Sequence, residues 1–275
     1  MKTILYIGEI KDFSDRWLIS QLKKFYKVVL WDIAEPFVFH KKRGINLILN
    51  RIYASVTERY GTSKIFKILD LITKMESLGI PVINSPEGYR MEINRLRQFE
   101  YFSSQNISYV RTEKFKNKFP ELKSNTFYVV KNALAFRHKK LPLVKNRKEI
   151  MNLKSFNLNS IILQPLIKRR VCYRTEIIGR WYATFTQLLK IRGAFLYFSY
   201  GKLIPSPLSK TFLEKIIEVV NNLKTKVFSI EYFIIDKNPI IVDFNCTSNY
   251  PQFFIKKVGN KLTEAWTKLI QNGIR

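Results

Sequence analysis

The pattern of apolar and polar residues over the first 84 positions is typical of a small α/β sheet. Short apolar runs predict four strands, at 3–7, 27–31, 45–49 and 80–84. A first helix, capped by Asp12 or Ser14, carries an apolar stripe formed by Leu18, Leu22 and Phe25. A second helix ends before Gly79 and buries Ile65, Ile68, Leu69, Ile72 and Met75. This order of elements favours a parallel sheet.

The pattern after residue 87 predicts a mixture of helices and antiparallel strands. Helices are expected near 96–105, 149–153, 209–226 and 263–271. Strands are expected at 127–131, 142–145, 160–164, 171–178, 181–189, 227–235 and 240–244. Two pairs of these strands form hairpins, with turns at 179–180 and 236–239. The fold class is therefore α/β with an α+β second part.

Composition excludes several classes of protein. The chain has 275 residues, of which 46% are hydrophobic, too many for a disordered segment. Two cysteines cannot build a disulfide scaffold or a Cys-type zinc site, and two histidines argue against a His-rich metal centre. No apolar run has the length of a membrane span, and the apolar N-terminal run is too short for a signal peptide. We therefore expect a reduced, cytoplasmic compartment and no membrane contact.

The formal charge of +27 leaves two interpretations open. A strongly basic chain favours acidic partners such as nucleotides, nucleic acid or acidic peptides. The alternative is a coding bias, since the sequence is rich in Lys, Asn, Ile, Phe and Tyr. The densest basic clusters are 137–140 and 168–170, and no zinc-finger, homeodomain or aromatic RNA-binding motif accompanies them.

Polar residues interrupt two apolar strands near the C-terminus. Glu231 lies in one strand, and Asp243 and Asn245 lie in the next, two residues apart and hence on one face. Glu231 joins that face if the turn closes in an even register. Two carboxylates and an amide oxygen are ligands that suit Mg²⁺. The alternative is a solvated sheet face.

Other candidates also leave two interpretations open. Lys131 at a strand end can neutralise phosphate, or it can be solvated. Arg95, in the middle of a helix, is typical of a surface residue. The segment 164–167 can form an adenine-binding hinge or an ordinary strand exit. Arg174 and Glu176 share a strand face, which suits either an ion pair or a substrate contact.

Taken in order, these segments resemble the ATP-grasp superfamily, and most of all its RimK-like carboxylate–amine ligases. The resemblance runs from about Asn46 to Pro251. It is carried by the segments 49–55, 78–85, 99–112, 127–131, 161–167, 173–179, 229–231 and 242–245. It implies an ATP-grasp fold with an N-terminal Rossmann-like domain at 1–86. Residues 87–164 and 165–275 would be the two ATP-grasp subdomains.

The resemblance implies an ATP-dependent ligase that forms an amide or peptide bond through an acyl-phosphate, with ATP and Mg²⁺ bound. Phosphate-binding residues would be Arg95 and Lys131. Adenine-binding residues would be Gln164, Pro165, Leu166 and Ile167. Metal ligands would be Glu231, Asp243 and Asn245. Substrate-orienting residues would be Arg174 and Arg192. The loop 132–140 would act as a lid, and the acceptor would meet Asn50, Arg51 and Ser55.

Departures from the family pattern keep a second hypothesis open. Arg95 stands where the family has a lysine, the loop after Lys131 lacks glycines, and 193–199 lacks an expected Arg and Asn. The alternative is a degenerate scaffold that binds nucleic acid or an acidic protein. A third hypothesis combines the two. The chain would be an amino acid or peptide ligase, and its positive surface would bind a substrate that is an acidic peptide or is carried on tRNA. The sequence is also compatible with an oligomer.

Overall fold

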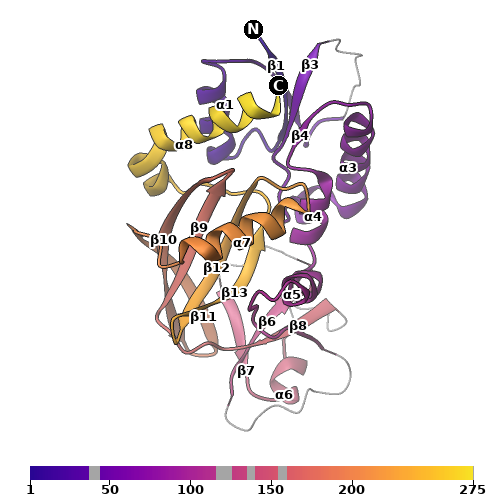
Figure 1. Ribbon diagram of the computed structural model, residues 1–275. Helices are drawn as coiled ribbons and strands as arrows, with labels where there is room; N and C mark the ends of the chain where they lie inside the picture. Colours follow the sequence, from indigo (N-terminus) through magenta and orange to yellow (C-terminus); the bar gives the residue numbers. More distant parts are fainter. Residues whose placement is uncertain (37–43, 116–125, 135–139, 154–159, 275) are drawn as a thin grey trace.

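The computed structural model describes residues 1–36, 44–115, 126–134, 140–153 and 160–274. Within these ranges the strands form two sheets, one of four strands and one of nine. In Figure 1 the four-stranded sheet lies at the top, beside both chain termini, and the larger sheet lies below it. The expected mixed α/β class is confirmed.

The first sheet has the strand order β2-β1-β3-β4, and all of its pairs are parallel. Its strands are β1 (Thr3–Gly8), β2 (Lys27–Asp32), β3 (Ile45–Asn50) and β4 (Val82–Ile83). The connecting helices are α1 (Phe13–Leu22), α2 (Val56–Tyr60) and α3 (Thr62–Ser77). β4 is shorter than predicted because Pro81 has no N–H to donate and Asn84 leaves the sheet to bond the backbone of Val227.

The helices of this part confirm most of the apolar pattern. Asp12 rather than Ser14 caps α1, because its carboxylate accepts a hydrogen bond from the Ser14 N–H. Phe25 lies beyond the end of α1 and is 49% exposed, so its predicted place in the apolar stripe is wrong. All five apolar residues predicted to face inward from α3 are buried, and Gly79 follows α3 with a φ of +85°.

The second sheet is antiparallel throughout and has the order β13-β12-β9-β10-β11-β7-β6-β8-β5. Its strands are β5 (Glu113–Lys114), β6 (Tyr128–Asn132), β7 (Lys140–Val144), β8 (Ile161–Pro165), β9 (Val171–Ile178), β10 (Trp181–Arg192), β11 (Phe195–Ile204), β12 (Val227–Ile235) and β13 (Asn238–Asn245). The remaining helices are α4 (Pro86–Glu92), α5 (Arg95–Ser104), α6 (Arg147–Met151), α7 (Lys210–Asn221) and α8 (Gln252–Gly273). None of the described helices is long and apolar enough to cross a membrane.

Several elements differ from the sequence analysis, which does not predict the short α2 and β5 and extends α7 to 226 rather than Asn221. The pattern does not predict β11, because most of its residues from Tyr197 on are partly or fully exposed and show no apolar alternation. It does not predict α4, whose seven residues are too short to show a helical period. α8 begins at Gln252 rather than near 263, and Phe254 and Val258 extend its buried face.

The predicted domain boundaries at 86 and 164 remain predictions. All strands of the first sheet precede residue 86. Strands β5–β8 occupy one end of the second sheet and β9–β13 the other, and the two ends meet where β7 pairs with β11.

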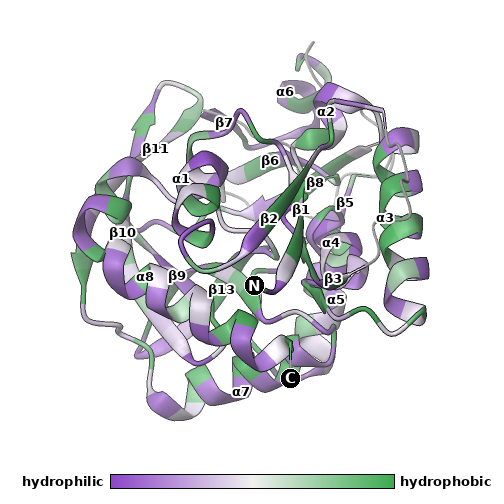
Figure 2. Ribbon diagram, turned by 90° about the horizontal axis from the view of Figure 1, so that it is seen from above, coloured by the Kyte–Doolittle hydropathy of each residue, from purple (hydrophilic) through white to green (hydrophobic). Residues whose placement is uncertain are grey.

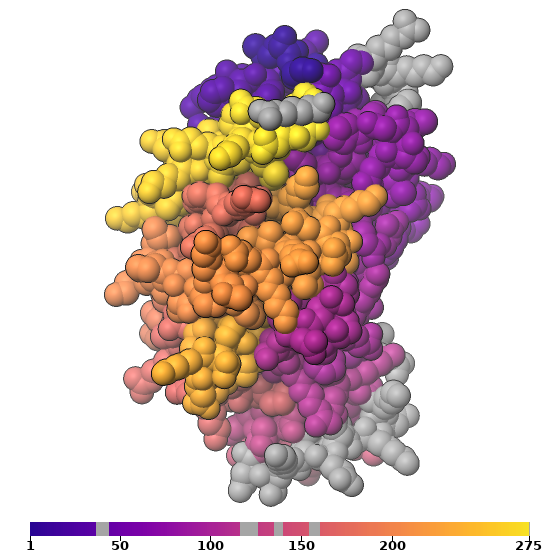
Figure 3. Space-filling view, in the orientation of Figure 1, coloured from indigo at the N-terminus to yellow at the C-terminus, as the bar shows by residue number. Residues whose placement is uncertain are grey.

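The C-terminal helix packs back onto the first sheet. Trp266 and Leu269 of α8 share a buried cluster with Ile4 and Leu47 of that sheet. Figure 3 shows the yellow C-terminal surface directly against the indigo N-terminal surface. Because α8 is held there, the segment 246–251 must run from the second sheet to the first, and its residues lie between the two.

Two helical glycines, Gly88 in α4 and Gly259 in α8, differ in the space around them. Replacing each by alanine therefore tests how tightly α4 is packed. A Cβ on Gly88 would collide with Thr225 Oγ1, whereas at Gly259 the nearest atom, Trp17 Cζ2, is 3.6 Å away. We expect Gly88→Ala to lower the free energy of unfolding by about 1–3 kcal/mol through overpacking. Gly259→Ala should raise it by about 0.5–1 kcal/mol, because alanine favours a helix. Urea unfolding measures both, and a change of the same sign in the two variants would contradict this packing.

Candidate active site

A cleft of about 340 Å³ lies between the exit of β3 and the second sheet. It is lined by Tyr53, Ala54, Ser55, Glu92, Arg95, Lys131, Leu141, Arg174, Gln187, Phe198, Ser199, Tyr200, Glu231, Asp243, Asn245, Thr247 and Asn249. Six of the predicted site residues, spread from position 95 to 245, therefore meet in one place. They are Arg95, Lys131, Arg174, Glu231, Asp243 and Asn245.

Two carboxylates face each other on the hairpin of β12 and β13. Glu231 and Asp243 are directly opposed across the strands, and Asn245 lies two residues further along β13. Directly opposed side chains in an antiparallel pair point to the same face, and all three residues line the cleft. The turn contains Asp236 and Lys237, both with positive φ, and continued unchanged its register would place Glu231 opposite Val242. A register shift between Glu231 and Tyr232 places Glu231 opposite Asp243 instead. Glu231 therefore joins the predicted face through this irregularity and not through the register of the turn.

The donor atoms of this trio fit a magnesium ion. Asp243 Oδ1 and Asn245 Nδ2 are buried and have no hydrogen-bond partner among the described residues. A bound cation would satisfy the carboxylate oxygen, and rotation of the amide would present its oxygen as well. Across the described ranges, no three His, Cys, Asp or Glu residues cluster so as to hold a metal. The candidate set is thus two carboxylates and one amide, which Mg²⁺ accepts when phosphate oxygens complete its shell.

Lys131 and Arg95 bring positive charge to these carboxylates. Lys131 is only 9% exposed, and its Nζ donates to the Val242 carbonyl at 3.4 Å. Burial lowers the pKa of the Lys131 ammonium, while the charge of Asp243 opposes that shift. Arg95 is also buried, and its Nε lies 3.5 Å from Asp243 Oδ1. The alternatives of a solvated lysine and a surface arginine are therefore wrong.

Arg95 also fastens the start of the loop that follows Lys131. It is the first residue of α5 rather than a mid-helix residue, because the Asn94 side chain caps the helix. Its Nη1 donates to the carbonyls of Asn132 and Leu134 at 3.0 and 3.1 Å. Residues 135–139 of the predicted lid lie outside the described ranges.

Arg174 on β9 bridges two carboxylates. Its Nε donates to Glu176 Oε1 at 2.7 Å, and its Nη1 donates to Glu231 Oε1 at 3.0 Å. The Glu176 side chain is fully buried and pairs with Arg174 within β9, while the pair of Arg174 with Glu231 joins β9 to β12. The ion-pair interpretation is confirmed. Because Arg174 also lines the cleft, its role as a substrate contact stays a prediction.

The predicted adenine hinge does not line this cleft. Gln164 is buried in β8, where its amide donates to Thr112 Oγ1 at 2.9 Å. The Leu166 N–H already donates to the Phe127 carbonyl at 2.8 Å. The segment 164–167 thus serves the sheet and its apolar packing, and adenine binding there remains a prediction.

Arg192 does not lie at the cleft either. It is exposed at the end of β10, opposite Phe195 and next to the turn at Gly193. The cleft is reached from β10 at Gln187, nearer the base of the hairpin. Because β10 continues as a strand to its tip, Arg192 lies outside the lining of this cleft, and its catalytic role stays a prediction.

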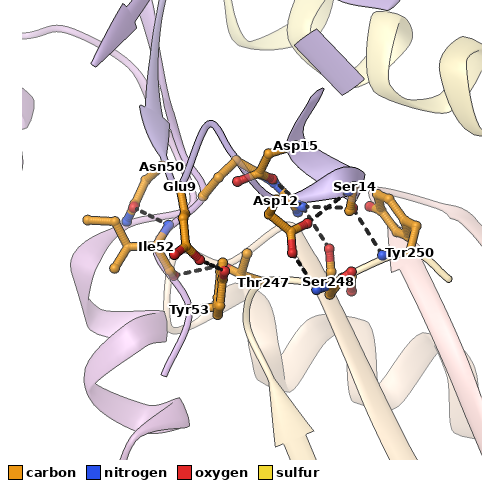
Figure 4. Close-up of polar contacts among 12 residues, drawn as sticks. Glu9, Asp12, Ser14, Asp15, Asn50, Ile52, Tyr53, Thr247, Ser248 and Tyr250 are labelled. Atoms are coloured by element: carbon orange, nitrogen blue, oxygen red, sulfur yellow. Dashed lines mark hydrogen bonds and ion pairs between the residues drawn. The ribbon is translucent and has the colours of Figure 1, made fainter. Parts of the chain in front are cut away.

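The three residues expected to meet the acceptor are all buried, and of them Ser55 lines the cleft, whereas Asn50 and Arg51 do not. Arg51 Nη2 donates to Asp15 Oδ1 at 2.9 Å and to the Ser248 carbonyl at 2.8 Å. Figure 4 shows how Asp15, from α1, approaches the segment after β13 that carries Ser248. Arg51 therefore joins the first sheet to that segment, and its contact with an acceptor stays a prediction.

Glu92 is a cleft residue that the sequence analysis does not single out. It ends α4, and its carboxylate accepts the backbone N–H of Ala54 at 2.8 Å and of Cys246 at 2.9 Å. It therefore ties the exit of β3 to the exit of β13. In the sequence, Glu92 is an acidic residue between the apolar Met91 and Ile93. This pattern indicates a buried carboxylate only when it is known that α4 ends at Glu92.

Glu92 predicts a pH dependence of stability. Burial raises the pKa of Glu92 to about 7, above the ordinary value of 4.5. As the pH rises, Glu92 loses its proton at a lower pH in the unfolded state than in the folded state. The folded state therefore loses stability relative to the unfolded state between about pH 4.5 and pH 7. At about 1.4 kcal/mol per pKa unit, we expect the free energy of unfolding to fall by about 3 kcal/mol across this range. Urea unfolding of wild type and Glu92→Gln from pH 4.5 to 8 measures this, and equal pH profiles would contradict it.

Comparison of the sequence with models of known families and with curated proteins gives no match. The fold, in contrast, matches solved structures over the whole chain. D-alanine–D-alanine ligase from Bacillus anthracis matches with a TM-score of 0.69 and 14% identity, over 100% of this chain and 98% of that one. A RimK domain ATP-grasp protein from Sphaerobacter thermophilus gives 0.66 and 18%, over 99% of each chain. A RiPP-associated ATP-grasp ligase from Chryseobacterium gregarium, solved with ADP and a leader and core peptide, gives 0.68 and 15%, over 99% and 97%.

Proposed function

We propose that this chain, which has the ATP-grasp fold of its structural matches, is an ATP-dependent carboxylate–amine ligase. One observation carries the proposal. Two opposed carboxylates and an amide on the β12–β13 hairpin share a single cleft with Lys131, Arg95 and Arg174. Such a cleft combines ligands for a hard cation with fixed positive charges, which is what phosphoryl transfer requires.

In the proposed reaction a substrate carboxylate takes the γ-phosphoryl group of ATP, and ADP leaves. An amine then attacks the acyl-phosphate, phosphate leaves, and an amide bond remains. Lys131 and Arg95 would neutralise charge on the transferred group from fixed positions. Arg174 would orient the carboxylate or the acyl-phosphate, held in place itself by Glu176. Walls of Phe198 and Tyr200 would limit the access of water.

Glu231, Asp243 and Asn245 would hold Mg²⁺, which supplies charge neutralisation at the phosphate oxygens when bound. Asp243 Oδ1, which is buried and accepts no hydrogen bond among the described residues, supports this assignment. The adenine position at 164–167 and the subdomains 87–164 and 165–275 belong to the same proposal.

We propose an amino acid or a peptide as the substrate. The matched D-alanine–D-alanine ligase and the ligase solved with a leader and core peptide support this class. An acidic peptide or a tRNA-borne amino acid would also suit the basic chain.

The proposal is tested by trapping the acyl-phosphate with hydroxylamine. The purified chain, ATP, Mg²⁺ and hydroxylamine are incubated with a panel of N-acetyl amino acids and short peptides, and hydroxamate and ADP are measured. We expect both products in equal amounts with at least one carboxylate, and their loss in Lys131→Met. Lys210→Met, at an exposed position of α7, is the matched control and should keep the activity. Nucleotide binding without hydroxamate from any carboxylate would favour a binding module instead.

A further inference from the structure

Of the Lys and Arg residues that the structure describes, only three, Arg95, Lys131 and Arg174, line the cleft. The hairpin of β10 and β11 carries further basic residues outside it. This hairpin also holds six exposed large apolar side chains, Tyr182, Leu188, Ile191, Phe198, Tyr200 and Leu203. One face of the hairpin is turned toward the cleft and the core, since Gln187 lines the cleft and Leu189 and Leu196 are buried. Figure 2 shows β10 and β11 at the outer side of the molecule, with β7 next to β11.

The opposite side of this hairpin and of β7 forms what we call the outer face, made of Lys140, Lys190, Arg192, Phe195 and Tyr197. Tyr197 of β11 is directly opposed to Lys190 of β10 on one side and to Lys140 of β7 on the other. Arg192 is opposed to Phe195 one row further along. Opposed residues and residues two apart share a face, so these five side chains lie together.

The contacts of Lys140 confirm this arrangement. Its Nζ lies 4.4 Å from the centre of the Phe195 ring, so both side chains are on the same face. Lys140, Lys190 and Arg192 are exposed, and the two rings are partly exposed. In the described part of the chain, no carboxylate forms an ion pair with any of these three cations. The outer face is thus a set of unneutralised cations around two aromatic rings.

The spacing of these groups suits a flexible polyanion that also carries flat rings. Lys190 and Lys140 are two strands apart, about 10 Å, with the Tyr197 ring between them, and Lys190 and Arg192 are about 7 Å apart along β10. Single-stranded nucleic acids bind through phosphates on cations and bases stacked on aromatic rings. An acidic peptide would use only the cations, so the two rings favour nucleic acid.

We propose that the outer face binds single-stranded nucleic acid, with phosphates on Lys140, Lys190 and Arg192 and bases stacked on Phe195 and Tyr197. The basic run 168–170 ends beside β10, because the Leu189 N–H donates to the Arg170 carbonyl. Of the other basic cluster, only Lys140 lies within the described ranges. The proposal goes beyond the ligase function and needs no group of the cleft.

The test measures binding to the protein by fluorescence anisotropy, without ATP and at several salt concentrations. The two labelled probes are an oligouridylate of 12 nucleotides and a polyglutamate of 12 residues. We expect the wild type to bind oligouridylate more tightly. Lys190→Gln combined with Arg192→Gln should weaken it about tenfold near 0.1 M salt and reduce the salt slope by about 1.4, at about 0.7 per phosphate. Tyr197→Leu keeps the charge and should weaken binding at least fivefold, through lost stacking.

Lys67→Gln combined with Lys74→Gln, both exposed on α3, removes the same charge on the side of the molecule away from the hairpin and is the matched control (Figure 1). We expect it to change the affinity less than twofold. Equal weakening by the control would show that net charge alone causes binding and would overturn the proposal. Tight binding of polyglutamate with no effect of Tyr197→Leu would assign the face to an acidic polypeptide and overturn it as well. Thermal melts establish that each variant is folded.

Discussion

Asp243→Asn should lower the rate of hydroxamate and ADP formation by about 100-fold or more while the protein remains folded. Asp243 is opposed to Glu231, its Oδ1 is buried, and Arg95 is the cation within ion-pair distance. Asparagine keeps the shape but removes one of the two carboxylates that would hold Mg²⁺. Losses of 10²–10³ are usual when one preorganised electrostatic group is removed from a reacting centre. The measurement is the trapping assay at saturating ATP.

Asp236→Asn provides the control for this variant. Asp236 lies in the turn of the same hairpin, exposed and with a φ of +48°, a conformation that asparagine adopts readily. We expect activity within twofold of the wild type. An Asp243→Asn enzyme as active as this control would show that the hairpin carboxylates do not serve the reaction.

Asp15→Ala should lower the free energy of unfolding by about 3–5 kcal/mol, because it leaves a buried guanidinium without its counter-ion. The side chains of Asp15 and Arg51 are 1% and 2% exposed and are joined at 2.9 Å. Arg51 also lies over the rings of Tyr250 and Trp266, at 5.5 and 5.8 Å from their centres. Since it links the first sheet to the segment that enters α8, the loss should appear in cooperative urea unfolding.

Two comparisons make this prediction specific. Asp70→Ala breaks the pair with Arg90, in which the Asp70 side chain is 63% exposed, and should change stability by less than about 1 kcal/mol. Asp15→Ala combined with Arg51→Met removes both charges and should recover part of the lost stability. Similar losses in Asp15→Ala and Asp70→Ala would mean that burial does not set the strength of the Arg51 pair.

The parts of the fold that the sequence predicts are those with local signals. The parallel sheet and the hairpins follow from short apolar runs and turn residues. The pairing of Glu231 with Asp243 needs in addition a register shift between Glu231 and Tyr232, which strand alternation does not predict. Lys131 and Arg174 could be chosen as candidates because each is a charge next to apolar strand residues.

The rest depends on contacts between distant segments. Arg95 is buried only because α5 begins against the loop after β6, and Glu92 acquires its role only where β3 and β13 end together. Arg192 is a candidate because it lies close in sequence to the segment 193–199, but only the strand register shows that its side chain shares a face with Lys190 and Tyr197. Periodicity along one element contains no information on which element will pack against it.

The most direct test of the central claim is isothermal titration of the wild-type protein with ADP and with ATP, each in the presence and absence of Mg²⁺. The carboxylates and cations gathered in the cleft predict micromolar binding that depends on Mg²⁺ and is lost in Asp243→Asn. A folded protein that binds neither nucleotide at millimolar concentration would contradict the assignment of this cleft as a nucleotide-dependent active site.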